Sequence, residues 1–120
     1  QLTPDEITEY YFKSGYAFFM TGDLTRASKN FFEIINVDSK YNAAANFYYA
    51  HIAYANNNYE TALKSFNKLS ESEAFAPVAP YYVAQIYFQQ GKYDEVISHT
   101  EPALQKPNLQ HVPDMKRLVA

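Results

Sequence analysis

The side chains that could do acid–base or metal chemistry in this sequence are three histidines and one pair of adjacent carboxylates. His51, His99 and His111 are scattered along the chain, without the HExxH spacing that places two imidazoles on one metal ion. A glycine-rich phosphate loop and a Gly-x-Ser-x-Gly elbow are absent from the sequence. Asp94 and Glu95 follow a predicted turn, where a helix N-terminus favours negative charge. We therefore predict a protein that is not an enzyme and uses no metal ion or cofactor.

The charge balance disfavours nucleic acid and anionic membranes as partners. Ten basic residues stand against thirteen acidic ones, for a formal net charge of −3, and binding to a phosphate backbone needs a basic excess. No apolar run approaches the roughly 20 residues that span a bilayer, so membrane insertion is not expected. Cysteine is absent, which excludes thiolate chemistry and disulfides. The composition predicts a single globular domain, residues 1–120, that must accommodate twelve tyrosines and nine phenylalanines.

An internal repeat of 34 to 35 residues predicts the elements that hold these side chains. The segment 22–31 recurs at 57–66 and, in a degenerate form, from residue 91. Apolar and small residues within each unit are spaced three and four apart, which is helical periodicity. A small residue stands seven positions before each turn: Gly15, Ala50 and Ala84. Each repeat is therefore predicted to be a helix, a tight turn and a second helix, which makes the fold all-α.

Capping residues predict where the first helix begins and ends. Thr3 and Glu6 have the spacing of a capping box, with Pro4 at the first helical position. The first helix is therefore expected from Pro4 to about Thr21, where Gly22 ends it.

The later helices have weaker signals. Asp23 and Asn58 are expected as N-caps of second helices, and Gly91 as a left-handed residue after a first helix. Pro102 falls inside the last full helix and is expected to kink it or to end it near Thr100. The third repeat is therefore predicted to be the least regular.

These positions resemble the tetratricopeptide repeat (TPR). The matching residues are Gly15, Gly22, Leu24, Ala27 and Phe31 in repeat one; Ala50, Asn57, Tyr59, Ala62 and Phe66 in repeat two; and Ala84, Tyr87, Gly91 and Tyr93 in repeat three. The family's early tryptophan is replaced by Tyr11, Asn46 and Pro80, and its closing proline is absent from repeats one and two. The resemblance implies three helical hairpins in a right-handed superhelical stack. Their ranges would be about 4–38, 40–73 and 77–107, with a short helix as a partial fourth unit or cap at about 112–120.

The resemblance also implies which side chains face a partner, because TPR proteins bind partners on the concave face of the first helices. Carried over residue by residue, that face holds Phe12, Lys13, Tyr16 and Phe19 in repeat one; Phe47, Tyr48, His51 and Tyr54 in repeat two; and Tyr81, Tyr82, Gln85 and Phe88 in repeat three. Two interpretations of these rings stay open. They fill the core between hairpins, or they form an exposed groove that binds a peptide or a partner's surface.

One TPR subtype grips a C-terminal carboxylate with paired Lys, Asn and Arg positions. The matching positions here are Phe12, Tyr16, Val78 and Tyr82, so the carboxylate clamp is absent and binding by apolar and aromatic burial is expected. If the rings form a groove, replacing Tyr48 and Tyr82 by Ala should weaken binding while helicity and melting stay nearly unchanged.

Two functions from different classes follow. The first is a protein-interaction module with an aromatic-lined groove. The alternative is a structural segment of a longer TPR solenoid, whose exposed edge stacks on further repeats or self-associates as a homo-oligomer. The chain begins with Gln1 and stops in mid-pattern, so we expect a piece of a longer protein. Its composition resembles the TPR portions of bacterial envelope proteins, which favours the periplasm or cell envelope over the cytoplasm.

Overall fold

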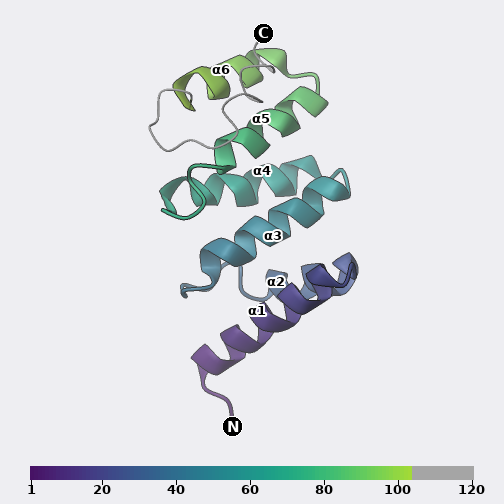
Figure 1. Ribbon diagram of the computed structural model, residues 1–120, viewed down its shortest axis with the longest axis vertical. Helices are drawn as coiled ribbons and strands as arrows, with labels where there is room; N and C mark the ends of the chain where they lie inside the picture. The colour runs from purple at the N-terminus through teal and green to yellow at the C-terminus, as the bar shows by residue number, and fades with distance from the viewer. Residues whose placement is uncertain (104–120) are drawn as a thin grey trace. The chain divides into compact units, whose positions relative to one another are not determined.

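The computed structural model describes residues 1–103, and the chain divides into two compact units on either side of the Ser65–Phe66 bond. The described residues contain six α-helices, a short 3-10 helix and no strand. In chain order these are α1 (Pro4–Met20), α2 (Leu24–Phe32), α3 (Asn42–Ala55), α4 (Tyr59–Asn67), the 3-10 helix Lys68–Glu71, α5 (Ala79–Gln89) and α6 (Tyr93–Ala103), as Figure 1 shows.

In chain order the helices form three helix–turn–helix units, α1–α2, α3–α4 and α5–α6, and α1 packs on α2, α2 on α3 and α5 on α6. The predicted all-α fold of TPR-type hairpins is therefore confirmed. The single domain over residues 1–120 stays a prediction. The expected helix at about 112–120 and His111 lie outside the described residues.

The caps of α1 form as predicted. The Thr3 hydroxyl accepts from the Glu6 backbone N–H at 3.2 Å, and the Glu6 carboxylate accepts from the Thr3 backbone N–H at 2.9 Å. After α1, Gly22 has a φ of +86°, and the equivalent Asn57 and Gly91 have φ values of +61° and +74°. A left-handed residue therefore ends the first helix of all three hairpins, and the sequence repeat is also a repeat of backbone conformation.

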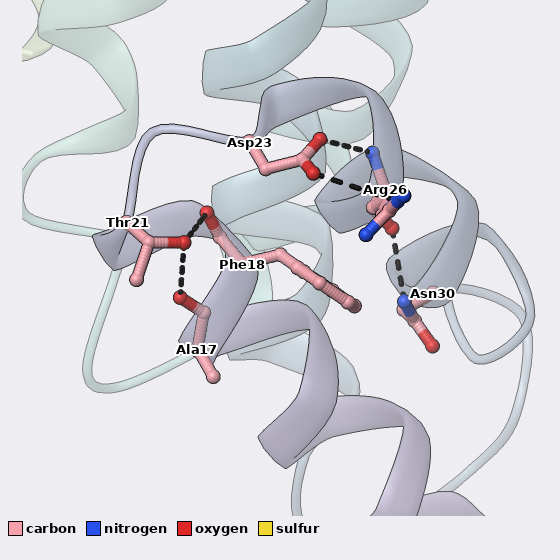
Figure 2. A network of polar contacts seen from close by, with 6 residues as sticks. All are labelled: Ala17, Phe18, Thr21, Asp23, Arg26 and Asn30. Carbon is pink, nitrogen blue, oxygen red and sulfur yellow. Dashed lines mark hydrogen bonds and ion pairs between the residues drawn. The ribbon is translucent and has the colours of Figure 1, made fainter.

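Short polar contacts fix the turn between α1 and α2 (Figure 2). The Thr21 hydroxyl donates to carbonyls of the last turn of α1, at 3.1 Å. Asp23 caps α2 as predicted, because its carboxylate accepts from the Arg26 backbone N–H at 3.1 Å and pairs with the guanidinium at 3.6 Å. That guanidinium also lies 5.7 Å from the centroid of the Phe18 ring, and the Asn30 amide donates to the Arg26 carbonyl at 2.9 Å. Side chains of the turn thus form hydrogen bonds with the end of α1 and with the start of α2.

The core of the first unit is packed around Phe31 of α2, which is fully buried. A Cβ atom added at Gly15 would lie only 2.8 Å from the Phe31 ring, so the small residue predicted in the first helix is required by this contact. The buried apolar residues that cluster here are Ala27, Phe31, Ile34, Ile35, Ala45 and Ile52. Ile34 lies in the turn that follows α2, and its backbone N–H donates to the Phe31 carbonyl at 3.0 Å.

In the second unit, α5 packs on α6. Val96 and Thr100 are buried in α6, in the sequence positions that Ala27 and Phe31 hold in the first repeat. The α6 helix continues to Ala103 with Pro102 inside it, so the helix does not end near Thr100, and the alternative expectation of a kink at Pro102 stays a prediction. A proline deprives only one carbonyl, four residues earlier, of its helical N–H donor, and the exposed Pro102 ring does not interrupt the helix.

Candidate functional site

Tyr48 of α3 lies at the centre of an aromatic cluster with α1. Its ring centroid lies 5.0 Å from that of Phe19 and 5.6 Å from that of Tyr16. On α3 itself, the Phe47 ring lies 5.6 Å from Tyr48 and 4.6 Å from the imidazole of His51. The Phe12 ring lies 6.3 Å from Tyr16 and 6.5 Å from Tyr48. We call these six side chains the aromatic surface: Phe12, Tyr16, Phe19, Phe47, Tyr48 and His51.

Helical spacing explains why these side chains meet. Phe12, Tyr16 and Phe19 are four and three residues apart, so they share one side of α1. Phe47 and His51 are likewise four apart on α3. Tyr16 is 40% exposed and the other five side chains are half-buried, so the cluster is open to solvent.

The same rings also rest on the core. Tyr48 stacks on the buried Phe31, with centroids 5.6 Å apart and ring planes 18° apart. Phe12 lies 5.9 Å from Phe31 as well. One edge of these rings therefore packs inward and the other is exposed, so they contribute to the core, and their binding of a partner stays a prediction. Replacing Tyr48 by Ala would remove a core contact, which argues against the expectation that such a variant melts normally.

Tyr41 is a neighbour of the aromatic surface that the sequence pattern did not single out. Its ring stacks on Phe12 with centroids 4.7 Å apart, and its hydroxyl donates to the Glu9 carboxylate at 3.0 Å. That hydrogen bond, together with Lys13 at 3.5 Å, lowers the pKa of Glu9 below its ordinary value. Tyr41 directly precedes α3, so the helical spacing of the predicted partner-facing positions did not mark it.

Asn46 stands where the TPR has its early tryptophan, and it forms hydrogen bonds instead of filling the position with an apolar ring. Its buried amide donates to the Ile35 carbonyl at 3.0 Å, and Asn42 donates to Ile35 at 2.9 Å and to the Val37 carbonyl at 2.8 Å. The two amides therefore tie the backbone after α2 to α3 and fix the helix that carries Tyr48. Their i, i+4 spacing was a usable signal in the sequence.

In the second unit, the predicted residues Tyr81, Tyr82 and Gln85 lie together. The Tyr81 and Tyr82 ring centroids are 5.2 Å apart, and the Gln85 amide donates to the Tyr81 hydroxyl at 2.8 Å. Tyr82 stacks on the buried Phe66 at 5.1 Å. Phe88, the remaining predicted residue of this unit, contacts Tyr93 at 5.6 Å.

The other predicted residue of the first unit, Tyr54, contacts Tyr59 at 5.9 Å. Tyr54 is the last of the predicted partner-facing positions on α3, and Tyr59 is the first residue of α4. This ring pair therefore spans the turn between the two helices of the second hairpin.

The surroundings of Tyr48, Tyr82 and His51 favour the uncharged forms of these three side chains. Burial raises the pKa of Tyr48, and neighbouring Tyr16 raises it further. Tyr82 behaves alike, through burial first and Tyr81 second. Burial lowers the pKa of the His51 imidazole. These groups can therefore donate or accept hydrogen bonds at the rim of an apolar contact, but they supply no charge.

Among residues 1–103, the other side chains with possible chemistry do not assemble into a second site. His99 lies against Tyr87, with ring centroids 5.1 Å apart, and Asp94 and Glu95 are exposed in the first turn of α6. In the described residues, no group of three or more His, Asp or Glu side chains could hold a metal ion. No helix over residues 1–103 has both the length and the apolar character to cross a bilayer.

Comparison with known families decides the assignment. The model of the family described as anaphase-promoting complex, cyclosome, subunit 3, matches residues 30–103, more than half of the chain. The chain belongs to this family. Its repeats are of the TPR type, a class of protein-interaction and scaffold repeats that is generally non-enzymatic. No curated protein matches the chain. The resemblance to bacterial envelope proteins stays an expectation.

Proposed function

We propose that this member of the family binds a protein partner through the aromatic surface, taking up apolar side chains of a peptide or of a partner's surface. The observation that supports the proposal is the exposed ring of Tyr16, which lies 5.6 Å from Tyr48 in a cluster with no charged member. Tyrosine combines an apolar ring with a hydrogen-bonding hydroxyl and is enriched in the parts of interfaces that contribute most binding energy.

The rings are held in place before any partner arrives. Tyr48 is packed between Phe19 and Phe31, and Phe12 is stacked between Tyr41 and Tyr16. A partner would therefore gain about 25 cal/mol for each Å² of apolar area that it buries. Little of this gain would be lost to the entropic cost of ordering these side chains. A surface of six rings is consistent with micromolar binding of a short segment.

The charge of the surface selects the kind of partner. Lys13, the cation nearest to it on α1, is paired with Glu9 at 3.5 Å. His51 has a lowered pKa and is neutral at pH 7. A segment that presents aliphatic or aromatic side chains fits this surface better than an acidic one, which would find no free cation among these residues.

The test is affinity capture from an extract of the source cells, with the wild-type chain and two single variants as baits. Tyr16→Ser removes the most exposed ring of the aromatic surface. Tyr10→Ser is the matched control, because Tyr10 is a more exposed tyrosine of the same helix, with its ring near Tyr11. We expect a protein retained by wild type and by Tyr10→Ser, and retained about ten-fold less by Tyr16→Ser.

The captured protein is then titrated against each variant by calorimetry. Equal affinity for wild type and Tyr16→Ser would contradict the proposal. Circular dichroism of all three proteins should be identical, because neither tyrosine is a core residue.

A further inference from the structure

A cavity of about 250 Å³ lies within the second unit, and we call it the α5–α6 cavity. It is bounded by the end of α4, the segment that leads to α5, the first turns of α5 and the last turns of α6. Its walls combine apolar and polar side chains, among them Phe66, Ala79, Val83, Asn67, Ser70 and Ser98. Of the described residues that line it, only His99 is titratable. The cavity therefore suits an uncharged ligand.

The internal repeat explains why a cavity forms here. Asn67 corresponds to Phe32 of the first repeat, 35 positions earlier. Val83 of α5 corresponds to Tyr49 of α3, 34 positions earlier. In the first unit the rings of Phe32 and Tyr49 are neighbours, with centroids 6.1 Å apart. The second unit thus has an amide and an isopropyl group where the first unit has two aromatic rings.

A third lining residue is reduced in size in the same way. Ser70 corresponds to Ile35, which is buried in the first unit. The residues just before them keep their burial, since Ile34 is 2% exposed and its equivalent Leu69 is 1% exposed. The backbone of the repeat is therefore followed by the same buried anchor in both units, and the cavity results from smaller side chains around it.

The size of the cavity indicates which ligand fits. An apolar cavity of about 150 Å³ in another protein takes up benzene. The α5–α6 cavity, at about 250 Å³, has room for the ring of a phenylalanine or tyrosine side chain and its substituents. In the first unit the equivalent space is used by rings of the polypeptide itself, which favours a ring carried by a protein.

A hydrogen-bond acceptor distinguishes tyrosine from phenylalanine. Pro102 has no N–H group, so the carbonyl of Ser98, one turn earlier in α6, lacks its helical donor. A helical carbonyl points along the axis towards the residue four positions later. Because Ser98 and Pro102 both line the cavity, this carbonyl oxygen lies at its wall, where the hydroxyl of a phenol can donate to it.

From the neutral lining, the size and this acceptor, we infer that the α5–α6 cavity binds a tyrosine side chain of a partner protein, whose hydroxyl donates to the Ser98 carbonyl. The ring packs against Phe66 and Val83. The site is separate from the aromatic surface, whose members belong to α1 and α3 of the first unit. One side chain supplies a weak contact, so an isolated tyrosine peptide is expected to bind with a dissociation constant of about 1 mM.

The first test is a nuclear magnetic resonance titration of the full, isotope-labelled chain with the peptide acetyl-Gly-Tyr-Gly-amide. Saturable shifts are expected at the backbone amides of Ser70, Val83 and Ser98. The carbonyl carbon of Ser98 should also move downfield, because it accepts the hydroxyl of the peptide. The matched peptide acetyl-Gly-Phe-Gly-amide has no hydroxyl and should leave that carbonyl resonance in place.

Two variants that restore residues of the first repeat test the location. Asn67→Phe and Ser70→Ile place larger side chains in the cavity, and each should raise the dissociation constant at least about ten-fold. Both positions are exposed, so the fold should tolerate the change, which circular dichroism verifies. Gln89→Phe is the matched control, because it adds the same ring at an exposed position at the other end of α5, outside the cavity. It should leave the constant within about two-fold.

A titration without saturable shifts would overturn the inference, and a cavity filled by residues 104–120 of the full chain would give that result. Shifts that persist unchanged in Asn67→Phe and Ser70→Ile would overturn it as well. A Ser98 carbonyl that responds alike to both peptides would contradict the hydrogen bond and the choice of tyrosine.

A titration with p-cresol separates a protein side chain from a free phenol. The tyrosine peptide should bind at least as tightly as p-cresol, whereas p-cresol binding about ten-fold tighter would overturn the assignment to a partner protein. None of these outcomes bears on the aromatic surface, since its test uses Tyr16 and a captured partner.

Discussion

The ring of Tyr48 in α3 stacks on the ring of Phe31 in α2, with centroids 5.6 Å apart and planes 18° apart. The second unit repeats this contact, since Tyr82 stacks on Phe66 at 5.1 Å and 8°. In both pairs the phenylalanine is fully buried and the tyrosine is half-buried. The stack joins the second helix of one hairpin to the first helix of the next. It therefore couples the packing of the repeats to the aromatic side chains proposed to bind a partner.

This stack predicts unequal effects at two tyrosines of the aromatic surface. Tyr48→Ala should lower the free energy of unfolding by about 2–3 kcal/mol, because it opens a gap over Phe31. Tyr48→Phe keeps the ring and should cost less than about 1 kcal/mol. Tyr16→Ala, at an exposed ring, should also cost less than about 1 kcal/mol. Urea denaturation followed by circular dichroism measures all three, and equal losses for the two alanine variants would show that the stack is not a core contact.

The close approach of α1 and α2 predicts that Gly15→Ala is destabilising. An added Cβ would lie 2.8 Å and 3.0 Å from two carbons of the Phe31 ring. Alanine gains up to about 1 kcal/mol in helix propensity, but overpacking a core ring costs about 1–3 kcal/mol. We expect a net loss of about 1 kcal/mol by chemical denaturation.

A double-mutant cycle provides the control for this clash. In a Phe31→Leu background the ring is gone, and Gly15→Ala should become neutral or stabilising. An unchanged penalty in that background would locate the strain elsewhere.

The buried hydroxyl of Thr100 marks a position where a substitution should stabilise the fold. Its side chain is buried, and its hydroxyl oxygen has no hydrogen-bond partner among the described residues. Thr100→Val keeps the shape and removes the unpaired group, so the free energy of unfolding should rise by about 1 kcal/mol. Thr8→Val is the matched control, because the Thr8 hydroxyl donates to the Pro4 carbonyl at 3.0 Å and that variant should gain nothing. A loss of stability in Thr100→Val would mean that the hydroxyl is paired in solution.

The lowered pKa of His51 predicts that the stability of the fold depends on pH. Burial lowers its pKa in the folded chain, so the unfolded chain takes up a proton first as the pH falls. The contribution of neutral His51 is complete above the ordinary pKa of about 6.5 and is lost as the pH falls from there towards the lowered folded-state value. The free energy of unfolding, measured in urea from pH 8 to pH 5, should drop less in His51→Gln than in wild type. Identical slopes in the two proteins would contradict this assignment.

The amino-acid sequence determined the local structure of this protein. Its period of 34 to 35 residues located the helical hairpins, and Gly22, Asn57 and Gly91 marked the turns that adopt positive φ. The Thr3–Glu6 capping box was equally readable. These features depend on interactions within a few residues, so spacing alone is sufficient to reveal them. The side chains of the aromatic surface were predicted from the resemblance to the TPR, and their three- and four-residue spacing explains why they share one side of each helix.

Only the tertiary structure decided what each of those side chains packs against. That Tyr48 rests on Phe31, and that Tyr41 stacks on Phe12, depends on contacts between helices that spacing along one helix does not describe. Burial is a property of neighbours brought together by the turns, and it distinguishes a ring that stabilises the fold from one that remains available to a partner.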